Sequence, residues 1–241
     1  IHLDASMACA GDGALSEAQM ADRAAELCAV AEAAAGGEAL SYVIGTEVPI
    51  PGGETDVLDT LAVTRPENAE RTYRLHREAF ARRGLDKALA RVVGLVVQPG
   101  VDFGNSQVFA YERERAVDLV RSLDQLPGLV FEAHSTDYQT EAALKALVAG
   151  HFAILKVGPE LTFAYREAIV AMAMIETRLP LAAKSGILDC VMTVMKANPR
   201  HWQGYVVDGP RQDDGLLFGL SDRIRYYWPQ AEIQAALKIL Y

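Results

Sequence analysis

The stretch Leu129-Val130-Phe131-Glu132-Ala133-His134-Ser135-Thr136-Asp137-Tyr138 decides the fold class of this chain. Its first residues are apolar, with β-branched and aromatic side chains, which is typical of a buried strand. The stretch then ends in a His-Ser-Thr-Asp cluster, whose side chains can bind a metal, move a proton or hold a phosphate. Parallel α/β enzymes place such clusters at the carboxyl ends of their strands. A structural alternative stays open, in which Ser135, Thr136 or Asp137 caps a helix over about Glu141–Val148. Both interpretations can hold together, because a helix N-terminus also favours an anion.

Other apolar segments of this kind alternate with helical patterns along the chain. The predicted strands are Ile1–Asp4, Tyr42–Glu47, Val92–Gln98, the stretch that delivers His134, and Phe152–Val157. The predicted helices cover about Ser16–Ala35, Pro66–Arg83, Glu112–Leu126, Glu141–Val148 and Glu160–Arg178. Strands that are near-continuous apolar runs between helices predict a parallel sheet buried on both faces.

Two architectures fit this alternation, an open doubly wound sheet and a (β/α)8 barrel. The open sheet usually binds a nucleotide through a glycine-rich first turn, but the sequence contains neither G-x-G-x-x-G nor G-x-x-x-x-G-K-[ST]. We therefore favour a (β/α)8 TIM barrel as a single domain over residues 1–241, with a helical C-terminal segment from about residue 180. Ile1–Asp4 already has the pattern of the middle of a strand, and Tyr241 ends a helical pattern. We expect a barrel seen as a fragment, without its first strands and without its last.

Composition narrows the class of protein further. The 241 residues are enough for one large domain core. The net charge of −9 argues against a nucleic-acid surface, which needs a basic face. The three cysteines are scattered without zinc-finger or redox spacing, which fits a reducing compartment. No signal peptide and no long apolar span is present. We expect a cytoplasmic protein with no nucleic-acid and no membrane partner.

Each predicted strand ends in a polar residue, and in a barrel such residues converge on one site. These residues are Asp4, Glu47, Gln98, His134 and Lys156. Carboxylate, amide and imidazole groups in convergence suit a divalent metal ion, whereas a lysine suits a phosphate or an oxyanion. We predict that Glu47 and His134 point into one cavity at the carboxyl end of the sheet, with the other three residues around its wall.

Structural alternatives stay open for several of these residues. Asp4 could cap a loop, and Gln98 could satisfy backbone groups. Lys156 is costly to bury without a partner, so it either pairs with a carboxylate or meets a substrate anion. The patch with Arg223 and Arg225 is more often a salt-bridged surface than a phosphate clamp. The remaining histidines are expected to be structural or solvent-facing, and they are His2, His76, His151 and His201.

Long, specific motifs occur along the whole chain. They are Tyr42–Pro49, Pro51–Thr55, Glu132–Thr140, His151–Pro159 and Ser221–Pro229. Together they resemble the GatZ/KbaZ family, the Z-type subunits of bacterial class II tagatose-bisphosphate aldolase. The resemblance implies that this chain is the middle of a larger protein. That family in turn resembles the class II fructose-bisphosphate aldolases, which are zinc-dependent (β/α)8 barrels.

The resemblance also implies roles for individual residues. Glu47 and the Gly52-Gly53-Glu54 loop resemble the acidic strand end and the proton-donor loop of those aldolases. His134 resembles a zinc ligand that precedes a phosphate-binding turn, whereas Gln98 stands where the aldolases have a second zinc-binding histidine. We expect a divalent ion, zinc for preference, at Glu47, His134 and Gln98, and catalytic roles for Glu54 and Asp4. The residues expected to bind phosphate or substrate are Ser135, Thr136, Lys156, Gly158, Arg223 and Arg225.

The resemblance leaves two functions open. In the first, the chain is part of a tagatose-bisphosphate aldolase subunit in tagatose and galactitol catabolism, and it supports a separate catalytic aldolase subunit in an oligomer. In the second, the protein is a stand-alone, metal-dependent tagatose-6-phosphate 4-epimerase that uses retro-aldol and aldol chemistry on a ketose phosphate. The polar strand ends favour the second function, because a scaffold does not need them. A third label used in the family, tagatose-6-phosphate kinase, has no support from a nucleotide-binding motif.

Overall fold

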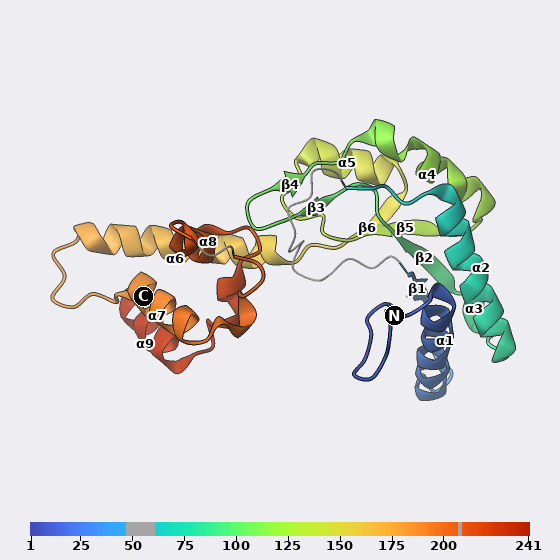
Figure 1. Ribbon diagram of the computed structural model, residues 1–241, viewed down its shortest axis with the longest axis horizontal. Coiled ribbons are helices and arrows are strands. Elements are labelled where there is room, and N and C mark those ends of the chain that lie inside the picture. The colour runs from blue at the N-terminus through green and yellow to red at the C-terminus, as the bar shows by residue number, and fades with distance from the viewer. Residues whose placement is uncertain (47–60, 207–208) are drawn as a thin grey trace. The chain divides into compact units, whose positions relative to one another are not determined.

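A computed structural model of the protein describes residues 1–46, 61–206 and 209–241. The chain divides into two compact units (Figure 1). Of the described residues, unit 1 contains 1–46, 61–102 and 109–156, and unit 2 contains 103–108, 157–206 and 209–241. Unit 1 carries the parallel sheet, and unit 2 is mainly helical. No helix in these ranges is long and apolar enough to cross a membrane.

The main sheet of unit 1 has the strand order β1-β2-β5-β6, and every neighbouring pair is parallel. The strands are β1 (Tyr42–Ile44), β2 (Val92–Val97), β5 (Val130–Ala133) and β6 (Phe152–Leu155). On the outer side of β1, His2 forms a parallel bridge with Val43, and this bridge is what the structure shows of the strand predicted over Ile1–Asp4. Spatial order therefore follows chain order, and the predicted α/β class with a parallel sheet is confirmed.

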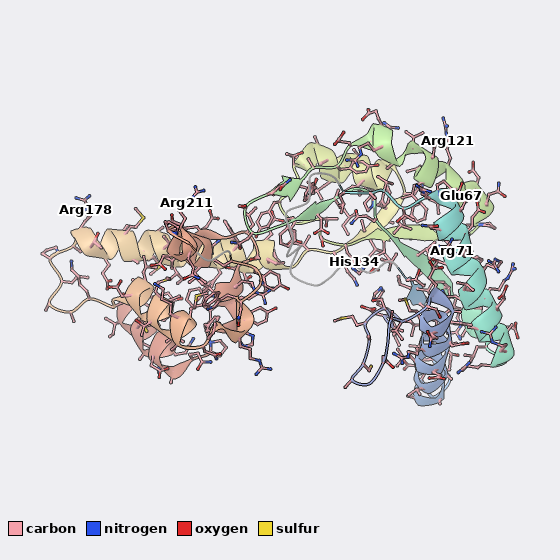
Figure 2. The ribbon with its side chains drawn as sticks, in the orientation of Figure 1. Glu67, Arg71, Arg121, His134, Arg178 and Arg211 are labelled. Atoms are coloured by element: carbon pink, nitrogen blue, oxygen red, sulfur yellow. The ribbon has the colours of Figure 1, made fainter. Side chains whose placement is uncertain are left out.

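The helices of unit 1 begin at residues that suit helix starts. Ser16 and Gln19 form a capping box at the start of α1, Pro66 occupies the first turn of α2, and Thr140 caps α5. The long helices α1 and α2 lie side by side (Figure 1). Arg71 of α2, which Figure 2 labels, forms an ion pair with Glu17 of α1 at 2.7 Å. The helices are α1 (Glu17–Ala34), α2 (Pro66–Arg82), α3 (Asp86–Leu89), α4 (Val117–Ser122) and α5 (Glu141–Ala149).

One predicted helix is broken into shorter pieces. The sequence predicted a continuous helix over Glu112–Leu126, but α4 covers only its middle. It lies between two 3-10 turns, η1 (Arg113–Ala116) and η2 (Leu123–Gln125).

The two faces of the sheet have different surroundings. Phe131 and Ala133 of β5 are fully buried in the core of unit 1. Side chains alternate along a strand, so Glu132 points to the opposite face, where its neighbours in register are Val96 and Ile154. At the end of β1 on this side, a Cβ at Gly45 would lie 2.6 Å from the Cβ of Val96, so only glycine fits this close approach.

Unit 2 has its own hydrophobic core and a buried ion pair between Arg166 and Asp222. Ile169, Val191, Met195 and Ile233 are among the residues that pack together there. The helices are α6 (Pro159–Arg178), α7 (Ile187–Ala197), α8 (Gln212–Phe218) and α9 (Ala231–Leu240), with 3-10 turns η3 (Pro199–His201) and η4 (Arg223–Tyr226). The short strands β3 (Asp102–Phe103) and β4 (Val108–Phe109) form a separate sheet.

Candidate metal centre

Three polar side chains of unit 1 meet around a single carboxylate oxygen, Oε1 of Glu132. Nε2 of His134 lies 2.6 Å from this oxygen, and Nζ of Lys156 lies 3.0 Å from it. Nε2 of His2 lies 3.3 Å from the same oxygen, and Nδ1 of His2 lies 3.4 Å from Nζ of Lys156. The Glu132 side chain is only 2% exposed. A buried carboxylate is thus surrounded by groups that can carry positive charge.

The parallel strands explain how three of these residues come together. Glu132 lies on β5, and His134 follows two residues later, so strand alternation directs both to the same side. Lys156 follows the end of β6, and its backbone N–H donates to the carbonyl of Ala133 at 2.9 Å. His134, which Figure 2 labels, directly follows the last residue of β5 in the chain. The carboxyl ends of β5 and β6 therefore deliver the acid, one histidine and the lysine.

His2 reaches the cluster from the opposite edge of the sheet. Its strand neighbour is β1, so three inter-strand steps separate it from β5 and four separate it from β6. At about 4.8 Å for each step, a flat sheet would place the backbones of His2 and Lys156 about 19 Å apart. Their side chains are nevertheless 3.4 Å apart. This face of the sheet must therefore be strongly concave, and the cluster lies in the concavity.

The surroundings change the proton affinities of two members of the cluster. Burial alone would raise the pKa of Glu132, but hydrogen bonds from His134 and Lys156 outweigh burial and leave that pKa lowered. Burial also lowers the pKa of His2, and the charge of Lys156 adds to this effect against the opposing charge of Glu132. The cluster thus favours an ionised carboxylate beside a neutral His2.

The donor atoms fit a divalent cation. One ligand atom each from His2, Glu132 and His134 can be chosen so that all three lie within 4.8 Å of one another. Nε2 of His2 is buried and makes no hydrogen bond to any described residue. Two imidazoles and one carboxylate form the ligand set of one class of catalytic zinc sites, in which a further position stays open for water or substrate. These residues could hold a metal ion.

The structure brings His134 and Lys156 of the predicted site together, and it adds two residues that the sequence did not single out. His2 was expected to be structural or solvent-facing, but it belongs to the cluster. The sequence contained a signal for the place of Glu132 in the cluster, because this residue precedes His134 by two residues on a predicted strand. His2 had no such signal, because its approach depends on the curvature of the sheet.

Asp4 and Gln98 have local partners instead. Asp4 is exposed, and its Oδ1 accepts hydrogen bonds from the backbone N–H and the hydroxyl of Ser6. Oε1 of Gln98 accepts from the backbone N–H groups of Gly100 at 2.8 Å and Val101 at 2.9 Å, which closes the turn after β2. These contacts match the structural alternatives given for the two residues, in which Asp4 caps a loop and Gln98 satisfies backbone groups. Glu47 and the Gly52-Gly53-Glu54 loop lie outside the described residues.

Two of the predicted phosphate-binding residues lie in the turn after β5. Ser135 has a left-handed backbone with φ 53°. The hydroxyl and the backbone N–H of Thr136 both donate to the carbonyl of Lys156, at 2.9 and 3.0 Å. This turn is therefore tied to the end of β6, beside the cluster.

Of the other predicted phosphate-binding residues, Lys156 belongs to the cluster in unit 1, and three lie in unit 2. Gly158 is the N-cap residue of α6. Arg223 donates to the carbonyl of His201 and lies over the ring of Tyr205, and Arg225 donates to the carbonyls of Ser221 and Asp222. Both guanidinium groups therefore have partners within unit 2.

The lowered pKa of His2 predicts that acid destabilises the metal-free protein. A histidine whose pKa is lowered by folding binds its proton more readily in the unfolded chain, so stability falls as the pH drops below about 6.5. Glu132 adds to this loss at lower pH, as its lowered pKa is approached. Buried His76 of α2 acts in the same direction as His2. We expect His2→Gln to make the urea-unfolding free energy decrease less between pH 7.5 and pH 5.5 than in the wild type. An unchanged pH dependence in this variant would contradict the conclusion that the lowered pKa of His2 contributes to destabilisation by acid.

Comparison with known proteins places these features in a family context. A family model described as "D-tagatose-1,6-bisphosphate aldolase subunit GatZ/KbaZ-like" matches residues 1–241. Proteins named D-tagatose-1,6-bisphosphate aldolase subunit GatZ, from Escherichia coli strain K12 and Shigella boydii serotype 18, are each 48% identical over 100% of this chain. A crystal structure titled as a probable tagatose 6 phosphate kinase from Sinorhizobium meliloti 1021 matches 99% of the chain with 48% identity and a TM-score of 0.87. The chain spans 58% of the length of each of these three proteins.

Proposed function

The chain belongs to the GatZ_KbaZ-like family, and from this premise we propose that the protein acts in tagatose-phosphate catabolism as a subunit of a tagatose-1,6-bisphosphate aldolase. In this role it supports a separate catalytic aldolase subunit within a cytoplasmic oligomer. The observation that carries the proposal is the match over the whole chain to relatives named as that subunit, at 48% identity. The pathway in which we place it is the breakdown of galactitol and tagatose.

We further propose that the sheet of unit 1 is an arc of a (β/α)8 barrel. Its strands are all parallel and adjacent in chain order, as in a barrel. The 3.4 Å contact between His2 and Lys156 across four inter-strand steps supports a curvature of the kind that closes a barrel. In this proposal residues 1–241 form one barrel domain, with the helices from about residue 180 as its C-terminal segment.

The cluster supports a proposed divalent-ion site, with zinc as the preferred ion. His2, Glu132 and His134 would hold the ion, and such an ion supplies polarisation of the ketose oxygens. Lys156, Ser135 and Thr136 are adjacent groups for the substrate phosphate. The roles predicted for Glu47 and Gln98 as ligands, for Glu54 and Asp4 in proton transfer, and for Gly158, Arg223 and Arg225 in phosphate binding remain proposals.

The cluster also favours a second candidate function, a stand-alone tagatose-6-phosphate 4-epimerase. A subunit that only stabilises its partner does not need a buried carboxylate surrounded by two histidines and a lysine. In retro-aldol and aldol chemistry, an acid/base residue has to move the proton of the C4 hydroxyl. Glu54 is the residue that we assign to this step.

Two assays separate these functions. The complete protein, stripped of metal and resupplied with Zn²⁺, Co²⁺ or Mg²⁺, is incubated alone with tagatose 6-phosphate, with and without ATP. The aldolase-subunit proposal expects no fructose 6-phosphate and no bisphosphate in this assay. It expects instead that adding the protein to a class II aldolase subunit raises the rate and the thermal stability of tagatose-1,6-bisphosphate cleavage. Fructose 6-phosphate formed by the protein alone would establish the epimerase, and ATP-dependent bisphosphate formation would establish a kinase.

A further inference from the structure

At the candidate metal centre, the ammonium group of Lys156 supplies the positive charge beside Glu132 that a bound metal ion would also supply. Its ammonium lies 3.0 Å from Oε1 of Glu132, the oxygen that His134 contacts, and 3.4 Å from Nδ1 of His2. We propose that Lys156 is an exchangeable counter-ion, which neutralises Glu132 in the metal-free protein and is released to bind the substrate anion when a divalent ion enters. This inference rests on the proposed metal site and adds to it a reason for the lysine.

The first step of the argument is the charge of Glu132. A buried carboxylate has to be compensated by a nearby cation or by hydrogen bonds. Lys156 provides this compensation when no metal is bound, so the acid can stay ionised and the cluster assembled. A divalent ion ligated by the same carboxylate would repel an ammonium at this distance. Metal and lysine therefore compete for Glu132.

The second step is the freedom of the lysine to leave. The Lys156 side chain is 41% exposed, whereas the side chains of Glu132 and His134 are 2% and 10% exposed. Its backbone is fixed, because its N–H donates to Ala133 and its carbonyl accepts from Thr136. Only the flexible four-carbon stem has to rotate toward solvent.

The third step is what the released ammonium can do. It would remain at the rim of the concavity, a short distance from the ion and next to the Ser135-Thr136 turn. A lysine ammonium is a compact point charge that suits a phosphate oxygen. The geometry thus couples metal entry to the creation of an anion site, and the ligand class is a phosphorylated sugar.

Metal affinity provides the first test. The complete protein is stripped with chelator and titrated with Co²⁺ by calorimetry, as wild type and as Lys156→Met, Lys156→Arg and the control Lys145→Met. Lys145 is exposed and forms an ion pair with Glu141, four residues away on α5. We expect Lys156→Met to bind Co²⁺ about tenfold more tightly than wild type, because the competing charge is gone. Lys156→Arg and the control should stay near the wild-type affinity. Equal or weaker binding by a folded Lys156→Met would overturn the exchange.

A second measurement needs no variant and so avoids any loss of folding. Reductive methylation of wild-type lysines is followed by mass spectrometry, with and without saturating Co²⁺. We expect the rate at Lys156 to rise about threefold with Co²⁺, because a lysine released from an ion pair is more accessible, while Lys145 stays constant. Inorganic phosphate should then protect Lys156 only in the Co²⁺-loaded protein.

The outcomes separate the two proposals. Co²⁺ binding with an unchanged methylation rate at Lys156 would overturn the exchange and leave the metal site standing. If neither wild type nor Lys156→Met binds Co²⁺, both the metal site and the exchange fail.

Discussion

Replacing Glu132 by glutamine is expected to weaken Zn²⁺ or Co²⁺ binding by about 100-fold, because the cluster loses its only anionic ligand among the described residues. The neutral amide keeps the volume of the side chain and can still accept a hydrogen bond from His134. Lys156 loses its counter-ion, but it is partly exposed and can turn toward solvent. We therefore expect a large loss of metal affinity with a folded protein, measured by calorimetry and by circular dichroism on the complete protein.

The matched control for this variant is Glu141→Gln. Glu141 also lies within ion-pair distance of a lysine, but its side chain is 81% exposed on α5. Metal affinity should be unchanged in this control. Retention of wild-type affinity by Glu132→Gln would show that the ion is held elsewhere, and the centre proposed at His2, Glu132 and His134 would have to be abandoned.

Replacing Asp222 by asparagine is expected to destabilise unit 2 by about 3–5 kcal/mol, because it leaves the charge of Arg166 buried without its counter-ion. The side chains of Arg166 and Asp222 are 2% and 0% exposed, and Nε of Arg166 lies 2.9 Å from Oδ1 of Asp222. Asparagine is the chosen replacement because Asp222 has φ 43°, a conformation that asparagine tolerates better than alanine. Urea unfolding and hydrogen exchange of the α6 amides would measure the loss.

Two further variants show whether the charge pair is the cause. Asp213→Asn removes a carboxylate from the exposed pair with Lys196, and it should change stability by less than about 1 kcal/mol. The double variant Arg166→Met/Asp222→Asn should recover much of the loss, because it leaves no unpaired charge in the core of unit 2. Burial raises the pKa of Asp222 although Thr162 and Arg166 act to lower it, so burying this carboxylate is itself costly. If Asp222→Asn is as stable as Asp213→Asn, the pair does not support unit 2.

The sequence determined the fold class because its signals are local. Apolar strands such as Val92–Val97 and Phe152–Leu155 are bounded by helices with recognisable starts at Ser16, Pro66 and Thr140. Apolar strands that alternate with helices form a parallel sheet, because the helical crossovers bring each strand back in the same direction and cover both faces. The same local signals do not specify where each element ends, and the helix predicted over Glu112–Leu126 is interrupted by 3-10 turns.

Members of the candidate cluster were predictable only where chemistry and strand position coincide. His134 directly follows a buried strand, and Lys156 was expected either to pair with a carboxylate or to meet an anion; it pairs with Glu132. Glu132 was within reach of the same reasoning, because strand alternation places it on the side of His134. By contrast, the oxygen of Gln98 accepts two backbone N–H groups of the following turn, and no strand-end rule reveals such local satisfaction in advance.

Only the tertiary structure decided that His2 contacts Glu132. Its position 130 residues before Glu132 carries no sign of their contact, and neither does its place beside β1 in the sheet order. The contact exists because the sheet curves and brings the first and last strands of the arc toward one concavity, where Nε2 of His2 lies 3.3 Å from Oε1 of Glu132. Curvature arises from the twist and packing of all the strands together, so no single segment of sequence encodes it. The residue types came from the sequence, and their convergence on one carboxylate came from the curved sheet.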